Sequence, residues 1–172
     1  DAMPSSLFDN EVKKEQDAYD KILSMDGKEN AYILHKELGE WMTDNVTVVR
    51  YNDKLLKTDQ KIQELMERYQ NININDTAKW SNQGASFTRQ LDGMLSLARV
   101  ITLGAYNRNE SRGAHYKPDF PERNDEEFLK TTKATFNPTK NAPDFSWEEV
   151  DTSLITPRKR DYSQKKQGAV KS

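Results

Sequence analysis

The segment from about Ser86 to Arg108 constrains the fold of this chain most strongly, because its apolar residues recur at the spacing of one helix face. The seam that they form is nearly continuous and comprises Phe87, Leu91, Met94, Leu95, Ala98, Ile101 and Ala105. A helix with such a seam draws most of its stability in water from packing against other elements. The segment therefore predicts a helical bundle.

Three earlier segments repeat this spacing. The first begins near Ser6, in a variant of the capping box, and carries Phe8, Val12, Tyr19, Ile22 and Leu23. The second begins at Asp26, with Glu29 three residues later, and carries Ala31, Leu34, Leu38, Trp41 and Met42. The third lies within about Asp53 to Gln70 and carries Leu55, Ile62, Leu65, Met66 and Tyr69. We expect three antiparallel helices with a fourth leading in.

A charged, irregular loop from Asn107 to Asp125 follows the strongest helix pattern. Gly113 tolerates a positive φ and can close the helix, and Pro118 and Pro121 prevent a helix from resuming. A stiff loop that carries charges and aromatic rings usually contacts a partner. The sequence therefore predicts a docking loop whose candidate contact residues are Glu110, Arg112, His115, Tyr116, Asp119 and Arg123.

Short runs rich in Thr and aromatic residues replace the helical pattern after this loop. The runs Leu129–Phe136 and Phe145–Val150 flank a loop-like stretch, Asn137–Pro143. They predict a two-stranded hairpin, which is marginally stable alone and needs the helices or another domain to cover one face. The tail from Gln164 to Ser172 has one apolar anchor, Val170, and is expected to be disordered.

The predicted fold class is mainly α, with a three- to four-helix antiparallel bundle followed by a C-terminal β-hairpin and a disordered tail. We divide the chain into a lead-in helix and linker (1–25), the helical bundle with the docking loop (26–125), the β-hairpin with a closing segment (126–162) and the tail (163–172).

Composition restricts the functions open to this chain of 172 residues. Apolar residues make up 34% of the chain and charged residues 31%. Such a lean core indicates either elongated helices or surfaces completed by other parts of a larger chain. The net charge of −2 provides no basic field for nucleic acid. The absence of cysteine excludes disulfides and thiolate ligands for zinc or an iron–sulfur cluster. No apolar run is long enough to span a membrane, and we expect no signal peptide.

The residue pattern assigns no catalytic, cofactor-binding or metal-ligating role. His35 lies beside an apolar stripe without triad-like neighbours, and Ser111 lacks the Gly-x-Ser-x-Gly elbow. His115 and Asp119 are four residues apart, but Pro118 prevents the helix that would align them as metal ligands. No Gly-x-Gly-x-x-Gly follows a predicted strand, so the cradle for a dinucleotide is missing.

Two basic features keep two roles open. The Arg112 guanidinium is a planar fork of donors that suits either a partner's carboxylate or carbonyl at an interface, or an internal tie to Glu110, Asp119 or Glu122. The basic run 158–160 is either a solvated end or a docking element.

The amino-acid sequence of the loop is similar to that of a known family. Glu110–Tyr116 followed by Asp119–Asp125 resembles the C-terminal domain of the succinate dehydrogenase flavoprotein subunit, and fumarate reductase and L-aspartate oxidase share a looser version. Further segments resemble the same domain: Ser24–Gly27, Asn30–Tyr32, Leu38–Met42 and Pro157–Tyr162. The resemblance runs from about Val12 to Tyr162.

This resemblance implies a subunit that oxidises succinate to fumarate. A hydride passes to covalently bound FAD while a basic group takes the second proton, and electrons leave through an iron–sulfur subunit to quinone in a membrane anchor. The flavin-linking histidine and the substrate-binding residues lie upstream in the family. We therefore expect FAD to bind in the intact subunit and no cofactor to bind to this chain. The chain alone is expected to be inactive.

The resemblance also implies partners and a location. The partners are the flavin-binding domain of the same subunit, the iron–sulfur subunit and, indirectly, the membrane anchor; nucleic acid is not expected. The location is peripheral, at the cytoplasmic side of a membrane. Two alternatives stay open, namely the same domain of a fumarate reductase or L-aspartate oxidase, and a stand-alone helical interaction module.

Overall fold

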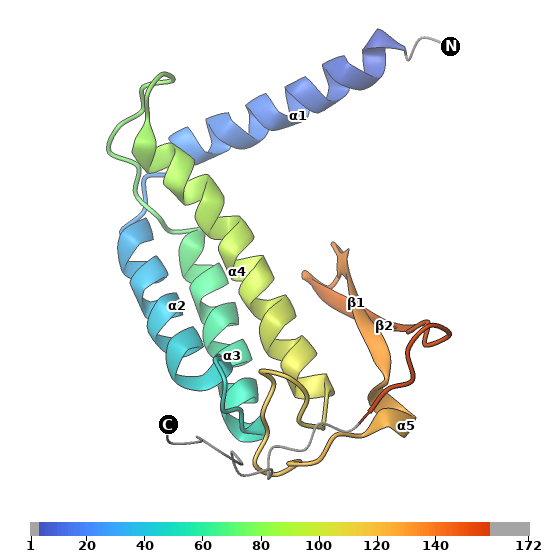
Figure 1. Ribbon diagram of the computed structural model, residues 1–172. Coiled ribbons are helices and arrows are strands. Elements are labelled where there is room, and N and C mark those ends of the chain that lie inside the picture. Colours follow the sequence, from blue (N-terminus) through green and yellow to red (C-terminus); the bar gives the residue numbers. More distant parts are fainter. Residues whose placement is uncertain (1–3, 159–172) are drawn as a thin grey trace, which may run out of the picture.

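The computed structural model describes residues 4–158, and a three-helix bundle forms its main body (Figure 1). Its helices are α2 (Ala31–Val46), α3 (Asn52–Tyr69) and α4 (Gln83–Asn107), and α3 runs antiparallel to the other two. The other elements are α1 (Ser5–Leu23), α5 (Asp125–Phe128), β1 (Lys130–Asn137) and β2 (Ala142–Glu149). The predicted helical bundle with a hairpin is confirmed. The predicted disordered tail lies outside the described residues.

The hydrophobic core lies between the three bundle helices. Leu91 and Leu95 of the predicted seam are fully buried there, and each such side chain contributes about 1.5–3 kcal/mol relative to an exposed one. Ile101 was predicted in the seam but is 50% exposed, because α4 turns Thr102 toward the bundle instead. The buried Tyr69 hydroxyl donates to the Thr88 carbonyl oxygen at 3.1 Å, and burial raises the pKa of Tyr69 to about 12.

The second helix begins later than predicted, and the start at Asp26 is wrong. α2 begins at Ala31, where the Asn30 side chain caps it by accepting from the Tyr32 N–H at 2.9 Å. The residues before it pair with the segment after α3 instead: the Asn71 carbonyl accepts from the backbone N–H of both Lys28 and Glu29. These tertiary hydrogen bonds satisfy the backbone donors that an Asp26 side-chain cap would have had to satisfy in a helix beginning there.

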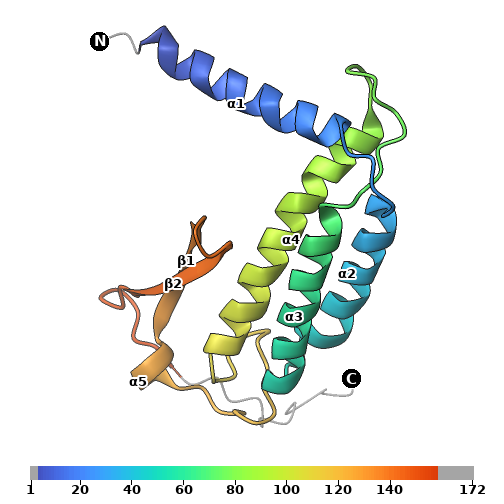
Figure 2. The ribbon, with the colours of Figure 1, turned by 180° about the vertical axis from the view of Figure 1, so that it is seen from behind.

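The first helix, α1, projects away from the bundle in both views (Figures 1 and 2). The capping box predicted at Ser6 is wrong, because α1 already begins at Ser5 after Pro4 and has no side-chain cap. Only the C-terminal end of its stripe is buried, where Ile22 and Leu23 pack with Ala85. The stripe residues Phe8 and Val12 are exposed, because no described element covers that part of α1.

The hairpin stands beside the C-terminal half of α4 (Figure 2). β1 and β2 pair antiparallel from Lys130↔Glu149 to Asn137↔Ala142, so the predicted loop Asn137–Pro143 is too long. Pro143 lies within β2, which a two-stranded sheet permits because each strand has an unpaired edge. Arg99 of α4 holds the hairpin tip by donating to the Asn141 carbonyl oxygen at 2.8 Å.

Candidate docking site

The predicted docking loop begins directly after α4, which ends at Asn107. Gly113 was predicted to close this helix but lies beyond its end, with a φ of +60°. It is the first central residue of a tight turn in which Arg112 and His115 exchange backbone hydrogen bonds of 2.8 and 3.0 Å. The positive φ of Gly113 therefore serves a two-residue hairpin turn.

Glu110 is the centre of this loop and has no exposed surface. Its carboxylate accepts from Arg108 Nη1 at 2.6 Å, from Arg112 Nε and Nη2 at 2.8 and 2.9 Å, and from the Asn124 N–H at 3.0 Å. Burial acts to raise the pKa of Glu110, but these hydrogen bonds from Arg112, Asn124 and Arg108 together hold it below its ordinary value. Glu110 is therefore a buried, ionised carboxylate.

Arg112 extends this arrangement to a second carboxylate. Its Nη2 donates to Asp125 Oδ1 at 2.7 Å, and Arg123 donates to the other Asp125 oxygen at 2.6 Å. Of the two roles left open for Arg112, the structure shows the internal tie to Glu110, with Asp125 as the second partner. We call the five residues Arg108, Glu110, Arg112, Arg123 and Asp125 the Glu110 cluster.

His115 attaches the loop to the connection between α2 and α3. Its Nδ1 lies 2.6 Å from Arg50 Nη1, and its Nε2 lies 2.9 Å from the Arg108 carbonyl oxygen. Because a guanidinium only donates, Nδ1 must accept, and the ring is neutral with its proton on Nε2. Burial lowers the pKa of His115, and the positive charges of Arg50, Lys117 and Arg108 lower it further against the opposing effect of the Arg108 carbonyl.

Lys117 is one of two residues that organise the loop but were not predicted from the sequence. Its side chain is almost completely buried, and Nζ donates to Asn52 Oδ1 at 2.7 Å, the Tyr106 carbonyl at 2.9 Å and Asn109 Oδ1 at 3.0 Å. Burial lowers its pKa to about 8. Lys117 thereby joins the start of α3 and the end of α4 to the loop. A lone lysine between Tyr116 and Pro118 carries no local signal of that role.

Arg108 was also missed, although it ended the predicted helix. Besides Glu110, its guanidinium donates to the carbonyl oxygens of Phe128 and Lys130 at 2.8 and 2.6 Å. It also lies over the rings of Phe128 and Trp147, 5.5 and 5.3 Å from their centroids. Arg108 thereby fixes the base of the hairpin to the loop.

The six predicted contact residues separate into two groups. Glu110, Arg112 and Arg123 belong to the Glu110 cluster, and His115 contacts Arg50, so these four point into the chain. Tyr116 and Asp119 lie at the surface, together with Phe120, which was not predicted. The loop is held from within and exposes a small aromatic and acidic surface.

The part of the chain that the structure describes offers neither a metal site nor a membrane-spanning helix. Between residues 4 and 158, no three His, Asp or Glu side chains gather in a way that could hold a metal ion. In the same range, no helix combines the length and apolarity needed to cross a membrane.

Comparison with known proteins identifies the family. Residues 35–162 match the family described as the fumarate reductase flavoprotein C-terminus. The chain belongs to this family. It is 74% identical over 164 residues to the succinate dehydrogenase flavoprotein subunit of Bacillus subtilis (strain 168), covering 95% of this chain and 28% of that protein. It is 33% identical over 160 residues to the fumarate reductase flavoprotein subunit of Proteus vulgaris, covering 92% and 27%.

A solved structure shares the fold as well. The FrdA chain of Escherichia coli quinol fumarate reductase superposes with a TM-score of 0.87 and 26% identity, covering 92% of this chain and 27% of that chain. The chain thus spans little more than a quarter of the length of these relatives. The resemblance to the C-terminal domain of the succinate dehydrogenase flavoprotein subunit is confirmed.

Proposed function

We propose that this chain is the C-terminal domain of a flavoprotein subunit that oxidises succinate to fumarate. The observation that supports the proposal is the 74% identity to a succinate dehydrogenase flavoprotein subunit over 95% of the chain, against 33% to a fumarate reductase subunit. The fold alone does not separate the two activities, because a fumarate reductase chain superposes at a TM-score of 0.87.

Residues 4–158 offer no cradle of the dinucleotide-binding kind for FAD. The sheet within residues 4–158 is a two-stranded antiparallel hairpin, and a dinucleotide cradle needs a strand, a glycine-rich turn and a helix in a parallel unit. In our proposal, upstream parts of the subunit hold FAD, and electrons pass to an iron–sulfur subunit and then to quinone. The subunit would be peripheral, attached through these partners at the cytoplasmic side of a membrane.

The role of this chain within the subunit is to support and dock. The Glu110 cluster, His115 and Lys117 fix the loop before any partner binds, which reduces the entropy lost on docking. Tyr116, Asp119 and Phe120 then form the contact surface toward the flavin-binding domain or the iron–sulfur subunit. In the division proposed above, this surface belongs to the unit 26–125.

Activity of the intact subunit tests the proposed reaction. The subunit assembled with its iron–sulfur partner should reduce an artificial acceptor dye when succinate is added. Preferential reduction of fumarate by a reduced dye would instead favour the fumarate reductase alternative. Oxidation of L-aspartate would favour the L-aspartate oxidase alternative. Absence of all three activities in a flavin-loaded subunit would overturn the proposal.

Substitution at the surface tests the docking role. Tyr116→Ser in the intact subunit should weaken assembly by about 10-fold, because aromatic side chains contribute much of the energy of an interface. The stability of the 172-residue chain by itself should change little, since Tyr116 is 42% exposed in it. Glu126→Ser, which alters an exposed residue of α5, is the control. Equal assembly of both variants with the iron–sulfur subunit, together with equal stability of the two intact subunits, would argue against docking through this loop.

A further inference from the structure

The middle of the docking loop is anchored to the bundle through one buried side chain. Within residues 111–120 only Lys117 is buried, and Tyr116 and Phe120 near it are 42% and 37% exposed. Lys117 Nζ lies between the start of α3 and the end of α4, where it donates to Asn52 and to the Tyr106 carbonyl. Opening of this stretch away from the helices therefore transfers the Lys117 amine from the interior into water.

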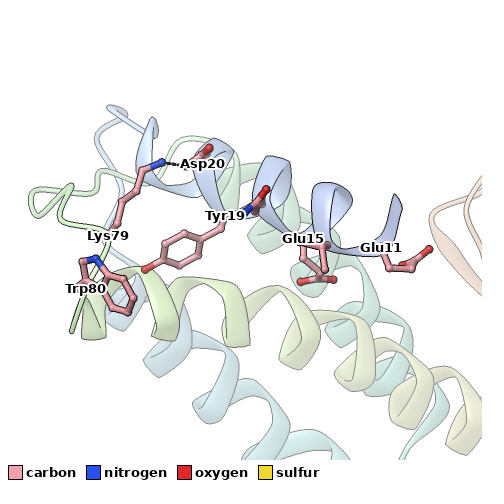
Figure 3. Close-up of a pocket in the computed structure, with 8 residues that line it drawn as sticks. Glu11, Glu15, Tyr19, Asp20, Lys79 and Trp80 are labelled. Atoms are coloured by element: carbon pink, nitrogen blue, oxygen red, sulfur yellow. Dashed lines mark ion pairs between the residues drawn. The ribbon is translucent and has the colours of Figure 1, made fainter. Parts of the chain in front are cut away.

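Two other lysines of the chain have carboxylate partners. Lys79 is exposed and pairs with Asp20 at 2.9 Å (Figure 3). Lys61 is partly buried and pairs with Glu64 at 2.8 Å. Lys117 is more deeply buried than either, and no carboxylate of residues 4–158 lies within 4.0 Å of its Nζ. An ammonium buried among neutral oxygens is unfavourable, because these oxygens replace only part of the hydration that the charge loses.

The charges that face Lys117 do not compensate for this burial. The titratable groups on the surrounding elements are Arg50 from the connection between α2 and α3, His115 and Asp119 from the loop, and Tyr106 from α4. Burial is the main cause that lowers the pKa of Lys117, and the Arg50 guanidinium lowers it further against the opposing effect of Asp119. The contribution of α3 is the neutral amide of Asn52. The interior therefore disfavours the charged form of the amine more than water does.

Loss of the proton has a smaller cost. An ammonium supplies three donors for the oxygens of Asn52, Tyr106 and Asn109, whereas a neutral amine supplies two. One oxygen then lacks its donor, which is less unfavourable than burying a charge without a counterion. The closed position of the loop therefore accepts both forms of the amine and, relative to water, favours the neutral one.

We propose that Lys117 is a proton-controlled latch of the docking loop, in which protonation of the amine favours opening of residues 111–120 and loss of the proton favours closure. The inference rests on the proposed function and deepens it, because opening displaces Tyr116 and Phe120 from the proposed contact surface. The closed latch has a pKa of about 8, and the ordinary pKa of a lysine is 10.5. The cost of the buried charge is therefore fully present below about pH 8 and is relieved as the pH rises toward 10.5.

Hydrogen exchange of the intact flavoprotein subunit, without its iron–sulfur partner, measures the opening. The readout is the protection factor of the amides in residues 111–120, which is the intrinsic exchange rate at each pH divided by the observed rate. From the two pKa values, the protection factor should rise about 10-fold between pH 7 and pH 9. Lys117→Met does not titrate and should give equal protection factors at both pH values. Lys36→Met, the same change at an exposed lysine, should retain the rise.

Asp119→Asn tests the latch without changing the buried amine. Because the Asp119 carboxylate raises the pKa of Lys117, its removal should shift the rise in protection to lower pH. Asp119 is exposed, so this variant should keep its fold even if Lys117→Met fails to fold.

Every contrary result overturns the inference. A protection factor that stays constant from pH 7 to pH 9 in the parent subunit means that the loop opens without exposing the amine. A protection factor that falls means that the hydrogen bonds of the ammonium outweigh its burial. A rise that persists in Lys117→Met, or that does not shift in Asp119→Asn, belongs to another group. Since the readout is exchange and not succinate oxidation, a failure here leaves the proposed function standing, and the reverse also holds.

Discussion

Glu110 shows how one residue organises the loop. A carboxylate with no exposed surface would be expelled or protonated unless donors replaced its lost water, and the two guanidinium groups and the backbone N–H around it do so. The neighbouring cations are in turn held in place by that carboxylate. The Glu110 cluster therefore depends on all of its members.

Glu110→Gln should lower the free energy of unfolding by roughly 2–5 kcal/mol, because Arg108 and Arg112 lose their shared anion. Denaturant titration of the chain and of the variant measures this. Glu126→Gln, the same change at an exposed site, should stay within about 0.5 kcal/mol of the parent. Similar losses in the two variants would show that the cluster contributes little.

His115 should make stability depend on pH. Because the folded chain keeps the pKa of His115 below its ordinary value of 6.5, the neutral ring contributes stability that is fully present above pH 6.5. That contribution is lost as the pH falls below 6.5 through the folded pKa, where a protonated ring would face Arg50 at 2.6 Å.

The free energy of unfolding, measured between about pH 7.5 and pH 5, should therefore fall more steeply in the parent chain than in His115→Gln. The amide of glutamine can still donate to the Arg108 carbonyl and accept from Arg50, but it does not titrate. Parallel pH profiles of the two proteins would exclude His115 as the titrating group.

At the scale of elements, the pairing of the segment before α2 with the segment after α3 depends on a glycine. A Cβ at Gly27 would lie 2.0 Å from the Asn71 carbonyl oxygen, closer than two atoms can approach. That carbonyl accepts from both Lys28 and Glu29, so any shift of the backbone there breaks the pairing that positions the start of α2.

Gly27→Ala should therefore destabilise the chain by about 1–3 kcal/mol or more. Gly39→Ala is the control, because a Cβ at Gly39 of α2 meets nothing within 4 Å. This second change should stabilise the chain by roughly 0.5–1 kcal/mol, since alanine favours the helix over glycine. Thermal unfolding of both variants should shift in opposite directions, and a shift in the same direction would contradict the close approach at Gly27.

The hairpin is an element whose attachment rests on a few polar contacts. Arg99 of α4 donates to the Asn141 carbonyl in the hairpin turn while its Nε donates to Asp59 of α3 at 2.8 Å, and both charged side chains are only 11% exposed. A two-stranded hairpin without this support would be only marginally stable in water.

Arg99→Ala should accelerate hydrogen exchange in β1 and β2 by about 10-fold or more, and by a larger factor than in the bundle helices. Lys140→Ala removes an exposed pair with Asp144 inside the hairpin and should have little effect. A uniform acceleration over bundle and hairpin would mean that Arg99 stabilises the chain globally and does not specifically hold the hairpin.

At the scale of the whole molecule, a three-helix bundle carries two attachments, α1 near one end and the hairpin along one side (Figure 1). The described part offers no parallel strand–helix unit for a dinucleotide. The purified 172-residue chain should therefore show no flavin absorbance and no dye reduction with succinate, whereas the intact subunit should show both. A yellow preparation of the chain alone would overturn this prediction.

The periodicity of apolar residues determined the helices, and the short runs rich in Thr and aromatic residues determined the hairpin, because both signals are properties of neighbouring residues. α3 and α4 accordingly begin and end within a few residues of their predicted bounds. The loop could also be recognised from the sequence, since Gly113, Pro118 and the clustered charges disfavour a helix within the segment that contains them.

The partners of those charges were decided only by the tertiary structure. Arg50 meets His115 across 65 residues, and Lys117 reaches Asn52 across the same separation. The same holds for the start of α2, which depends on the distant Asn71 carbonyl, and for the uncovered face of α1. A hydrogen bond or a buried surface exists only when two distant segments meet, so no local pattern can specify it.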